Sequence, residues 1–220
     1  MIFDMKKYIL ILMIILLAGG LFLARAVKQA LEQNATPTSS PTQAVESPEL
    51  SPTITANPNA LALPVADFKA RVTKKPFGIY ITPQSSPAQP ERFSGFHTGA
   101  DAEYEDATID VPVFAVADGT VVLSKTATGY GGVFVIEIQL NGKAHSVLYG
   151  HIRPSSLPKV GTQVTKGEQL AFLGTGFSAE TDNERRHLHF AVLATNVLDI
   201  RGYVPAQSQL SGWIDPLTFY

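Results

Sequence analysis

The hydrophobic positions of the chain begin with one unbroken run. Residues 8–24 contain 17 residues without a charge and follow Lys6 and Lys7. A helix of that length is about 25 Å long, near the minimum for a bilayer core of about 30 Å, and the run exceeds the usual apolar region of a signal peptide. We therefore expect a transmembrane helix that anchors residues 1–26, with the protein in the cell membrane in a single pass and the remainder of the chain outside the cytoplasm. Cleavage after residues 24–26, followed by secretion, is the alternative.

From about residue 32 to residue 64 the hydrophobic pattern disappears. This stretch is rich in Pro, Thr, Ser, Ala and Asn and contains no glycine. Its apolar side chains are too few to offset the entropy that ordering the backbone would cost, and its repeated prolines favour extended polyproline II segments. The composition therefore predicts a disordered linker over residues 27–65, which we interpret as a passive stalk.

A third pattern starts at about residue 66, where short alternating runs rich in Val, Ile, Phe and Tyr are separated by Gly and Pro. Alternation with a period of two is typical of strands with one buried face. The expected strands are residues 68–73, 78–82, 113–115, 119–125, 133–140, 144–152, 169–174 and 187–194. Asn141-Gly142 predicts a tight hairpin, and no amphipathic helix longer than one or two turns is expected. The pattern predicts an all-β domain with an antiparallel β-sheet over residues 66–220.

The amino-acid composition excludes several kinds of functional site. The chain has 220 residues, enough for one full-sized domain with appendages. Its net charge of -2 lacks the basic footprint of a nucleic-acid-binding protein. The sequence contains no cysteine, which excludes disulfides, thiolate nucleophiles and cysteine-ligated zinc. Any metal ion must therefore be bound by nitrogen and oxygen atoms.

The last apolar run carries two histidines. His187 and His189 are two residues apart, so on a strand their side chains project from the same face, while Leu188 and Phe190 face the core. Two histidines do not complete a metal site, and further ligands must come from elsewhere in the chain.

His97 and Asp101 form a second pair, with Gly99 between them to let the backbone bend. Imidazole and carboxylate are ordinary zinc ligands, and one more histidine would complete a three-ligand site with a fourth position open to water. His151 ends a predicted central strand, where the structural alternative is a hydrogen-bonded histidine at a strand edge. His145 lies six residues earlier, about 20 Å away along a strand, so we interpret it as a surface residue.

Residues 160–174 predict two short strands around a turn at Lys166. Lipoyl and biotinyl carrier modules have a modified lysine at such a tip, which leaves a metal-free carrier or adaptor domain as an alternative function. Because the flanking methionines of those carriers are missing here, Lys166 is better interpreted as a solvated turn residue.

Together the motifs resemble the lysostaphin-like zinc endopeptidases, the LytM-type family that acts on bacterial cell walls. The resemblance extends from about Pro76 to Pro216, and the pieces occur in the order of the family. They are Pro76-Phe77-Gly78, His97-x-Gly99-x-Asp101, Val116-Ala117-Asp118-Gly119-Thr120-Val121, Gly129-Tyr130-Gly131-Gly132, Tyr149-x-His151, Val160-Gly161 with Val164-x-Lys166-Gly167, Gly174-x-Gly176, His187-Leu188-His189-Phe190 and Asp215-Pro216.

The resemblance implies a β domain of the duplicated hybrid motif type and a zinc ion (Zn2+) held by His97, Asp101 and His189. It also implies that His151 and His187 are catalytic histidines which assist a metal-activated water. The implied substrates are peptide cross-links or stem peptides of peptidoglycan. Because the family includes relatives that have lost ligands and regulate other wall hydrolases, a non-hydrolytic peptidoglycan-binding or hydrolase-activating module is the alternative.

Three segments depart from the family pattern. Residues 102–111 form a longer and acidic loop, residues 178–186 are charged rather than small and polar, and Tyr80 stands where many members have arginine. We expect these departures to alter substrate preference and to leave the metal site intact. An acidic rim would attract a free amine on a peptide stem, and the alternative is a solvated loop.

Overall fold

The computed structural model describes residues 60–220, and the expected anchor and most of the expected linker lie outside this part of the chain. Within residues 60–220 no helix is long and apolar enough to cross a membrane. The helices there have three to six residues, whereas a bilayer core requires about 20. The expected location in the cell membrane through a single helix is therefore corrected, since the structure does not support it.

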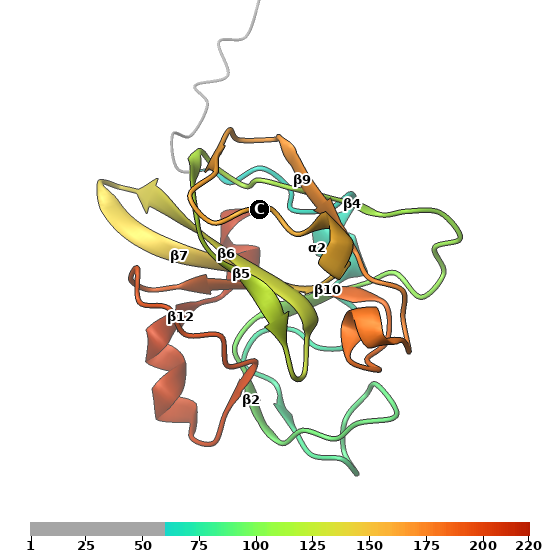
Figure 1. Ribbon diagram of the computed structural model, residues 1–220. Helices are drawn as coiled ribbons and strands as arrows, with labels where there is room; N and C mark the ends of the chain where they lie inside the picture. The colour runs from blue at the N-terminus through green and yellow to red at the C-terminus, as the bar shows by residue number, and fades with distance from the viewer. Residues whose placement is uncertain (1–59) are drawn as a thin grey trace, which may run out of the picture. The chain divides into compact units, whose positions relative to one another are not determined.

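An antiparallel sheet of seven strands forms the centre of the domain (Figure 1). The strand order is β12-β10-β7-β6-β5-β8, and β3 shares an edge of β10 with β12. The strands are β3 (Ala100–Glu103), β5 (Gly119–Ala127), β6 (Gly131–Leu140), β7 (Lys143–Ile152), β8 (Gln163–Val164), β10 (His187–Leu193) and β12 (Trp213–Ile214). The long strands confirm the runs predicted from alternation, and the mostly β character of the domain is confirmed with them.

Two smaller sheets and several short helical turns complete the domain. One sheet has the order β1 (Tyr80–Ile81), β2 (Gly95–His97), β11 (Tyr203–Val204), and the other pairs β4 (Pro112–Phe114) with β9 (Gln169–Phe172). The 3-10 turns are Pro154–Ser156, Ala179–Thr181, Gln207–Gly212 and Pro216–Phe219.

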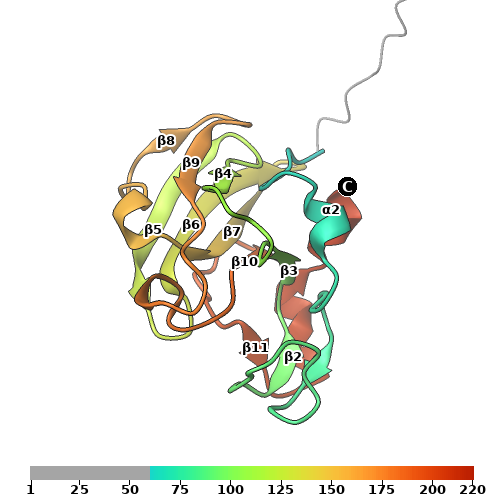
Figure 2. The same cartoon turned by 90° about the vertical axis from the view of Figure 1, so that its right-hand side faces the viewer.

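The strand predicted at residues 68–73 is wrong, because Phe68–Arg71 form the helical turn α2, which lies beside β3 (Figure 2). Phe68 is the only buried residue of this turn, and its ring packs edge-on against Phe190 with centroids 5.3 Å apart. This segment buries one side chain, that of Phe68, and belongs to none of the sheets described here. It therefore lacks the alternation of buried and exposed side chains that is expected of a strand.

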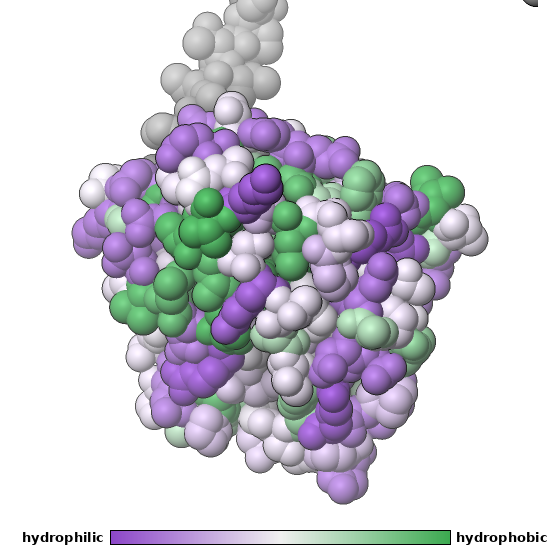
Figure 3. Space-filling view, in the orientation of Figure 1, coloured by the Kyte–Doolittle hydropathy of each residue, from purple (hydrophilic) through white to green (hydrophobic). Residues whose placement is uncertain are grey.

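The β6–β7 hairpin positions the central sheet. Asn141 and Gly142 have φ angles of 52° and 72°, the left-handed pair that a two-residue type I′ turn requires, so the hairpin prediction is confirmed. On β6, Phe134 and Ile136 enter the larger apolar cluster while Val133 and Val135 enter a second cluster on the opposite face. The sheet is therefore buried on both faces. The face of the molecule in Figure 3 mixes hydrophilic and hydrophobic residues, with one hydrophobic group toward its left side.

Residues 60–65, which the composition assigns to the linker, pack on the domain. Leu61 and Val65 are 7% and 1% exposed and belong to the larger apolar cluster. The amide of Ala62 donates to the Val116 carbonyl at 2.8 Å, and the Pro64 carbonyl accepts from the Phe114 amide at 2.8 Å. Residues 60–65 are therefore part of the folded domain.

Two residues that sequence analysis set aside are located by the fold. His145 is 8% exposed and its Nδ1 donates to the Leu193 carbonyl at 2.9 Å, so its interpretation as a surface residue is wrong. The neighbouring strand β10 covers it. Lys166 is exposed in the turn between β8 and β9, where its amide donates to Asp118 at 2.7 Å. This placement agrees with a solvated turn residue.

Candidate metal centre

Three strands bring the predicted ligands together. Because β3 pairs with β10, Asp101 lies opposite His189, and β2 ends at His97. The turn from β2 to β3 passes Gly99, where a Cβ atom would lie 2.6 Å from the Phe190 carbonyl oxygen and 2.9 Å from the His189 ring. Only glycine fits this approach, which explains the glycine in the His-x-Gly-x-Asp spacing.

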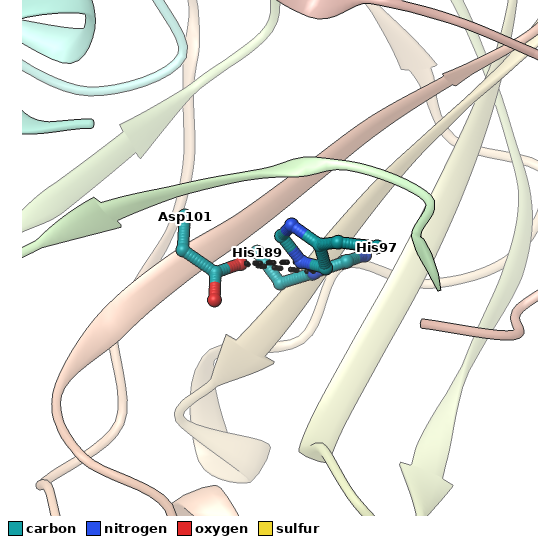
Figure 4. A group of neighbouring side chains, drawn as sticks. All are labelled: His97, Asp101 and His189. Atoms are coloured by element: carbon teal, nitrogen blue, oxygen red, sulfur yellow. Dashed lines mark hydrogen bonds and ion pairs between the residues drawn. The ribbon is translucent and has the colours of Figure 1, made fainter. Parts of the chain in front are cut away.

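The side chains of His97, Asp101 and His189 converge on one point (Figure 4). Nε2 of His97 lies 3.0 Å from Nδ1 of His189 and 3.1 Å from Oδ1 of Asp101, and the last two atoms are 3.0 Å apart. All three residues are at most 3% exposed. Nδ1–H of His97 donates to the Pro76 carbonyl at 3.1 Å, which leaves the lone pair of Nε2 facing the other two atoms.

This cluster fits a divalent metal ion. A carboxylate oxygen is an acceptor, and each imidazole nitrogen is one in the tautomer that carries its proton on the other ring nitrogen, so the three atoms can all offer lone pairs to one ion. A tetrahedral zinc ion with ligand distances of about 2.0–2.1 Å places its ligand atoms about 3.3 Å apart. The observed separations of 3.0–3.1 Å are close to that value. The arrangement can therefore hold zinc through nitrogen and oxygen, as a chain without cysteine requires.

Burial sets the protonation of the cluster. It lowers the pKa of His189 to about 4, so this imidazole is neutral at neutral pH. Burial has the opposite tendency for Asp101, but the neighbouring His97 and His187 outweigh it and hold the pKa of that carboxyl well below its usual range. A neutral imidazole and an ionised carboxylate are the forms that bind a metal ion.

His151 and His187 lie beside the cluster, with ring centroids 4.1 Å apart. Nδ1–H of His187 donates to the Arg185 carbonyl at 2.9 Å, and its Nε2 lies 3.3 Å from Oδ2 of Asp101. His151, the last residue but one of β7, has a φ of 61°, a left-handed conformation that strains a residue with a side chain. Burial lowers the pKa of His151 well below its usual value, and His187 adds to this effect.

Three buried polar atoms at this place lack a hydrogen-bond partner within residues 60–220: Nδ1 of His151, Nε2 of His189 and the hydroxyl of Tyr130. The Tyr130 ring lies 5.3 Å from the His151 ring and 5.5 Å from the His189 ring. Buried polar atoms without partners are rare because each costs the free energy of its lost hydration. Their concentration around one point marks a place where a bound molecule completes the hydrogen bonds.

Four of the five predicted residues line a cleft of about 350 Å³, and His97 is fully buried behind it. The cleft is lined by Lys75, Phe93, Ser94, Asp101, Thr128, Gly129, Tyr130, His151, Glu184, Arg185, His187, His189, Ile200, Arg201, Gly202 and Tyr203. Sequence reasoning assigned no role to Lys75, Tyr130 or Arg185. Only Tyr130 had a signal in the sequence, because it stands inside one of the family motifs.

The charged segment 178–186 is neither a free acidic rim nor a solvated loop. Oδ2 of Asp182 accepts from Arg92 and from the Gly129 amide, each at 2.6 Å, and Oε1 of Glu184 accepts from Arg92 at 2.9 Å. Arg185 is 4% exposed and points inward. The charges of this segment are therefore largely paired within the protein, and they offer little net attraction for a free amine.

Comparisons with known proteins agree with this geometry. Residues 95–199, which include all five candidate residues, match the model of Peptidase family M23. The murein hydrolase activator EnvC of Escherichia coli (strain K12) is 43% identical over 63 residues, which cover 29% of this chain and 14% of the length of EnvC.

Two solved structures match the chain with TM-scores below 0.5. A chain of the SpoIIIAH and SpoIIQ complex is 22% identical with a TM-score of 0.48, and the match covers 73% of this chain and 99% of that one. LytU is 25% identical with a TM-score of 0.42, and the match covers 68% of this chain and 83% of LytU. Residues 95–199 match Peptidase family M23, and this match agrees with the LytM-type family that the motifs of the chain resemble.

Proposed function

We propose that this chain is a zinc-dependent endopeptidase that hydrolyses peptide cross-links or stem peptides of bacterial peptidoglycan. The observation that carries the proposal is the grouping of the five candidate residues: Asp101, His151, His187 and His189 line one cleft, and the buried His97 contacts Asp101 and His189. The match of residues 95–199 to a peptidase family supports hydrolysis of peptides. The name of the related EnvC supports murein as the material on which the domain acts.

In this proposal Nε2 of His97, Oδ1 of Asp101 and Nδ1 of His189 hold the zinc ion. A bound zinc ion supplies a Lewis acid that lowers the pKa of a water molecule and polarises a peptide carbonyl. The protein holds the three ligand atoms in place through the β3–β10 pairing and the hydrogen bond from His97 to Pro76. This fixed arrangement avoids reorganising the ligands during the reaction.

His151 and His187 transfer protons in the proposed reaction. His151 is neutral at neutral pH because burial lowers its pKa, so it can accept a proton from the attacking water. The Arg185 carbonyl orients the His187 ring with Nε2 toward Asp101, and together the two histidines provide a proton acceptor and a proton donor for the leaving amine. The Tyr130 hydroxyl, which has no partner among the described residues, is available to donate to the substrate oxygen.

A second candidate function is that of an activator of another peptidoglycan hydrolase. The relative EnvC, by its name an activator of murein hydrolases, favours this function over the 63 matched residues. An activator needs the fold and a binding surface but no turnover at the cleft. The complete set of candidate ligands and proton carriers distinguishes the first proposal from this one.

The two functions are separated by digesting purified peptidoglycan with the zinc-loaded full chain and identifying the products by mass spectrometry. The endopeptidase predicts new peptide amino and carboxyl termini, loss of this activity with a zinc chelator and its return when zinc is added. The activator predicts no new termini from the chain alone and more product when a separate wall hydrolase is present. A zinc-bound protein that cleaves no peptide bond would contradict the first proposal.

A further inference from the structure

Arg185 is a buried arginine directly beside the candidate metal centre. Its side chain is 4% exposed, and its guanidinium reaches two carboxylates on strand β3. Nε donates to Oε2 of Glu103 at 2.8 Å, and Nη2 donates to Oε1 of Glu103 at 2.7 Å and to Oδ2 of Asp101 at 2.8 Å. Arg185 therefore forms a two-bond fork with Glu103 and a single bond with Asp101.

These contacts give the two oxygens of Asp101 different surroundings. Oδ1 faces the two histidine nitrogens of the cluster, at 3.0 Å and 3.1 Å. Oδ2 accepts from Arg185 at 2.8 Å and lies 3.3 Å from Nε2 of His187. A carboxylate can bind a metal ion through one oxygen or through both, and an oxygen that already accepts a charged hydrogen bond is less available.

Glu103 explains why the arginine can be buried there. It is two residues from Asp101 on β3, so both side chains project from the same face, and its charge balances the guanidinium. The planar fork of arginine fits the Glu103 carboxylate through two parallel bonds, which fixes the remaining N–H direction toward Asp101. The next residue, Arg186, differs: its Nη1 donates to the Ala107 carbonyl at 3.0 Å and it is not among the cleft residues.

We propose that Arg185, held by Glu103, is a positioning residue that keeps Oδ2 of Asp101 occupied and so restricts this carboxylate to one-oxygen metal binding through Oδ1. The inference rests on the proposed zinc site and adds to it a determinant of coordination. It gives a function to part of the charged segment by which this chain departs from the family pattern. A carboxylate released from Arg185 would be free to rotate or to bind through both oxygens, which weakens or alters the site.

The test uses the full chain and measures zinc affinity by competition with a chromophoric chelator, together with the visible spectrum of the Co2+-substituted protein. In R185Q the zinc affinity should fall about 10- to 100-fold, as is usual when a residue that orients a metal ligand is lost. The Co2+ spectrum should change as well, since it reports coordination number. R185K, which keeps the charge but has no fork, should lie between R185Q and the wild type. R186Q is the matched control and should keep the wild-type affinity and spectrum.

Removing Arg185 alone leaves two buried carboxylates close together, so R185Q is compared with the charge-balanced double variant R185Q/E103Q. The double variant should fold and should still lose zinc affinity, whereas E103Q alone weakens the fork that directs Arg185 and should lose less affinity than R185Q. Wild-type affinity and an unchanged Co2+ spectrum in the folded double variant would overturn the inference. Absence of zinc binding in the wild type would instead overturn the proposed function.

Discussion

Over residues 187–190 the two faces of strand β10 are equally buried and chemically opposite. His187 and His189 are 2% and 3% exposed on one face, and Leu188 and Phe190 are 0% exposed on the other. Exposure therefore does not distinguish the candidate site from the core. The apolar pair packs against apolar partners such as Phe68, whereas the histidines face a carboxylate and buried polar atoms that have no hydrogen-bond partner within residues 60–220.

This difference teaches that one strand encodes stability and chemistry at alternate residues. Burial of polar groups lowers the stability of the fold, whereas burial of apolar groups raises it. The histidines therefore destabilise the strand locally, and Leu188 and Phe190 offset this loss. If the two roles are separate, mutations on one face should change activity with little loss of stability, and mutations on the other should do the reverse.

The largest effect is expected on the histidine face. His189→Ala removes one of three candidate ligands, so we expect loss of bound zinc and a fall in peptidoglycan hydrolysis of at least about 10⁴-fold, more than about 5 kcal/mol in activation free energy. Metal analysis and product quantification measure both. The circular dichroism spectrum should remain that of the folded β domain. Hydrolysis at the wild-type rate would disprove the site.

On the opposite face, Phe190→Ala should lower the free energy of unfolding by about 3–5 kcal/mol, because it leaves a cavity beside Phe68 in the core. Denaturant unfolding measures this loss. Zinc content and hydrolysis should stay close to the wild type at temperatures where the variant is folded. Loss of zinc from the folded variant would show that the two faces are coupled after all.

A third variant tests whether a buried charge in the wall of the cleft contributes to stability, as core residues do, or to activity, as the candidate site residues do. Lys75 pairs with Glu91, which also accepts from the Phe93 amide at 2.8 Å, and Lys75 and Glu91 are 2% and 9% exposed. Lys75→Met leaves Glu91 buried without its cation, so a loss of about 3 kcal/mol in unfolding free energy is expected at neutral pH. The double variant K75M/E91Q should recover much of this loss.

The same pair predicts a dependence on pH. Burial favours the protonated form of Glu91, but the bonds from Lys75 and the Phe93 amide outweigh it and lower the pKa of this carboxyl. The stability from the pair is therefore present above the unfolded pKa of about 4.3 and is lost as pH falls through the lower folded pKa. Unfolding measured from pH 3 to pH 7 should show the difference between the wild type and K75M shrinking toward the acid end. A difference independent of pH would contradict this assignment.

The smallest effect is expected at the fifth histidine. His145 donates to the Leu193 carbonyl on the same sheet but lies outside the cleft. His145→Ala should lower the free energy of unfolding by about 1 kcal/mol, the usual net value of one hydrogen bond, and should leave zinc binding and hydrolysis unchanged. A loss of zinc in this variant would show that a buried histidine outside the cleft also affects metal binding. It would contradict the assignment of metal binding to the residues at the cleft alone.

Sequence alternation was sufficient for the long strands, because each buries one regular set of side chains against the core. It also placed His187 and His189 on one face and Leu188 and Phe190 on the other, as the structure has them. The order of the motifs predicted that His97, Asp101 and His151 lie at the same centre, and the structure places them there. These features are local in the sequence or repeat with a fixed period, which is why they are readable without a structure.

Other features depend on partners that are distant in the chain. The strand Ala100–Glu103 has no β-branched or aromatic residue, and it is a strand only because β10 supplies its hydrogen bonds. The inward direction of Arg185 is set by Glu103, 82 residues earlier, so the charged segment could not be separated from a solvated loop by composition. Leu61 and Val65 are likewise isolated apolar residues in a proline-rich stretch, and only the core around them shows that they are anchors.

The pairing register between β3 and β10 has a consequence for folding fidelity. His189 pairs with Asp101 and with Gly150, so two strands fix its position at once. A slip of one residue would turn both histidines of β10 into the core and both apolar residues into the cleft. Such an error would be all or none, without a partly competent form. A metal ion that bound at this candidate centre would therefore bind only correctly registered chains in a refolding mixture, and its binding would report on the register of the folded molecules.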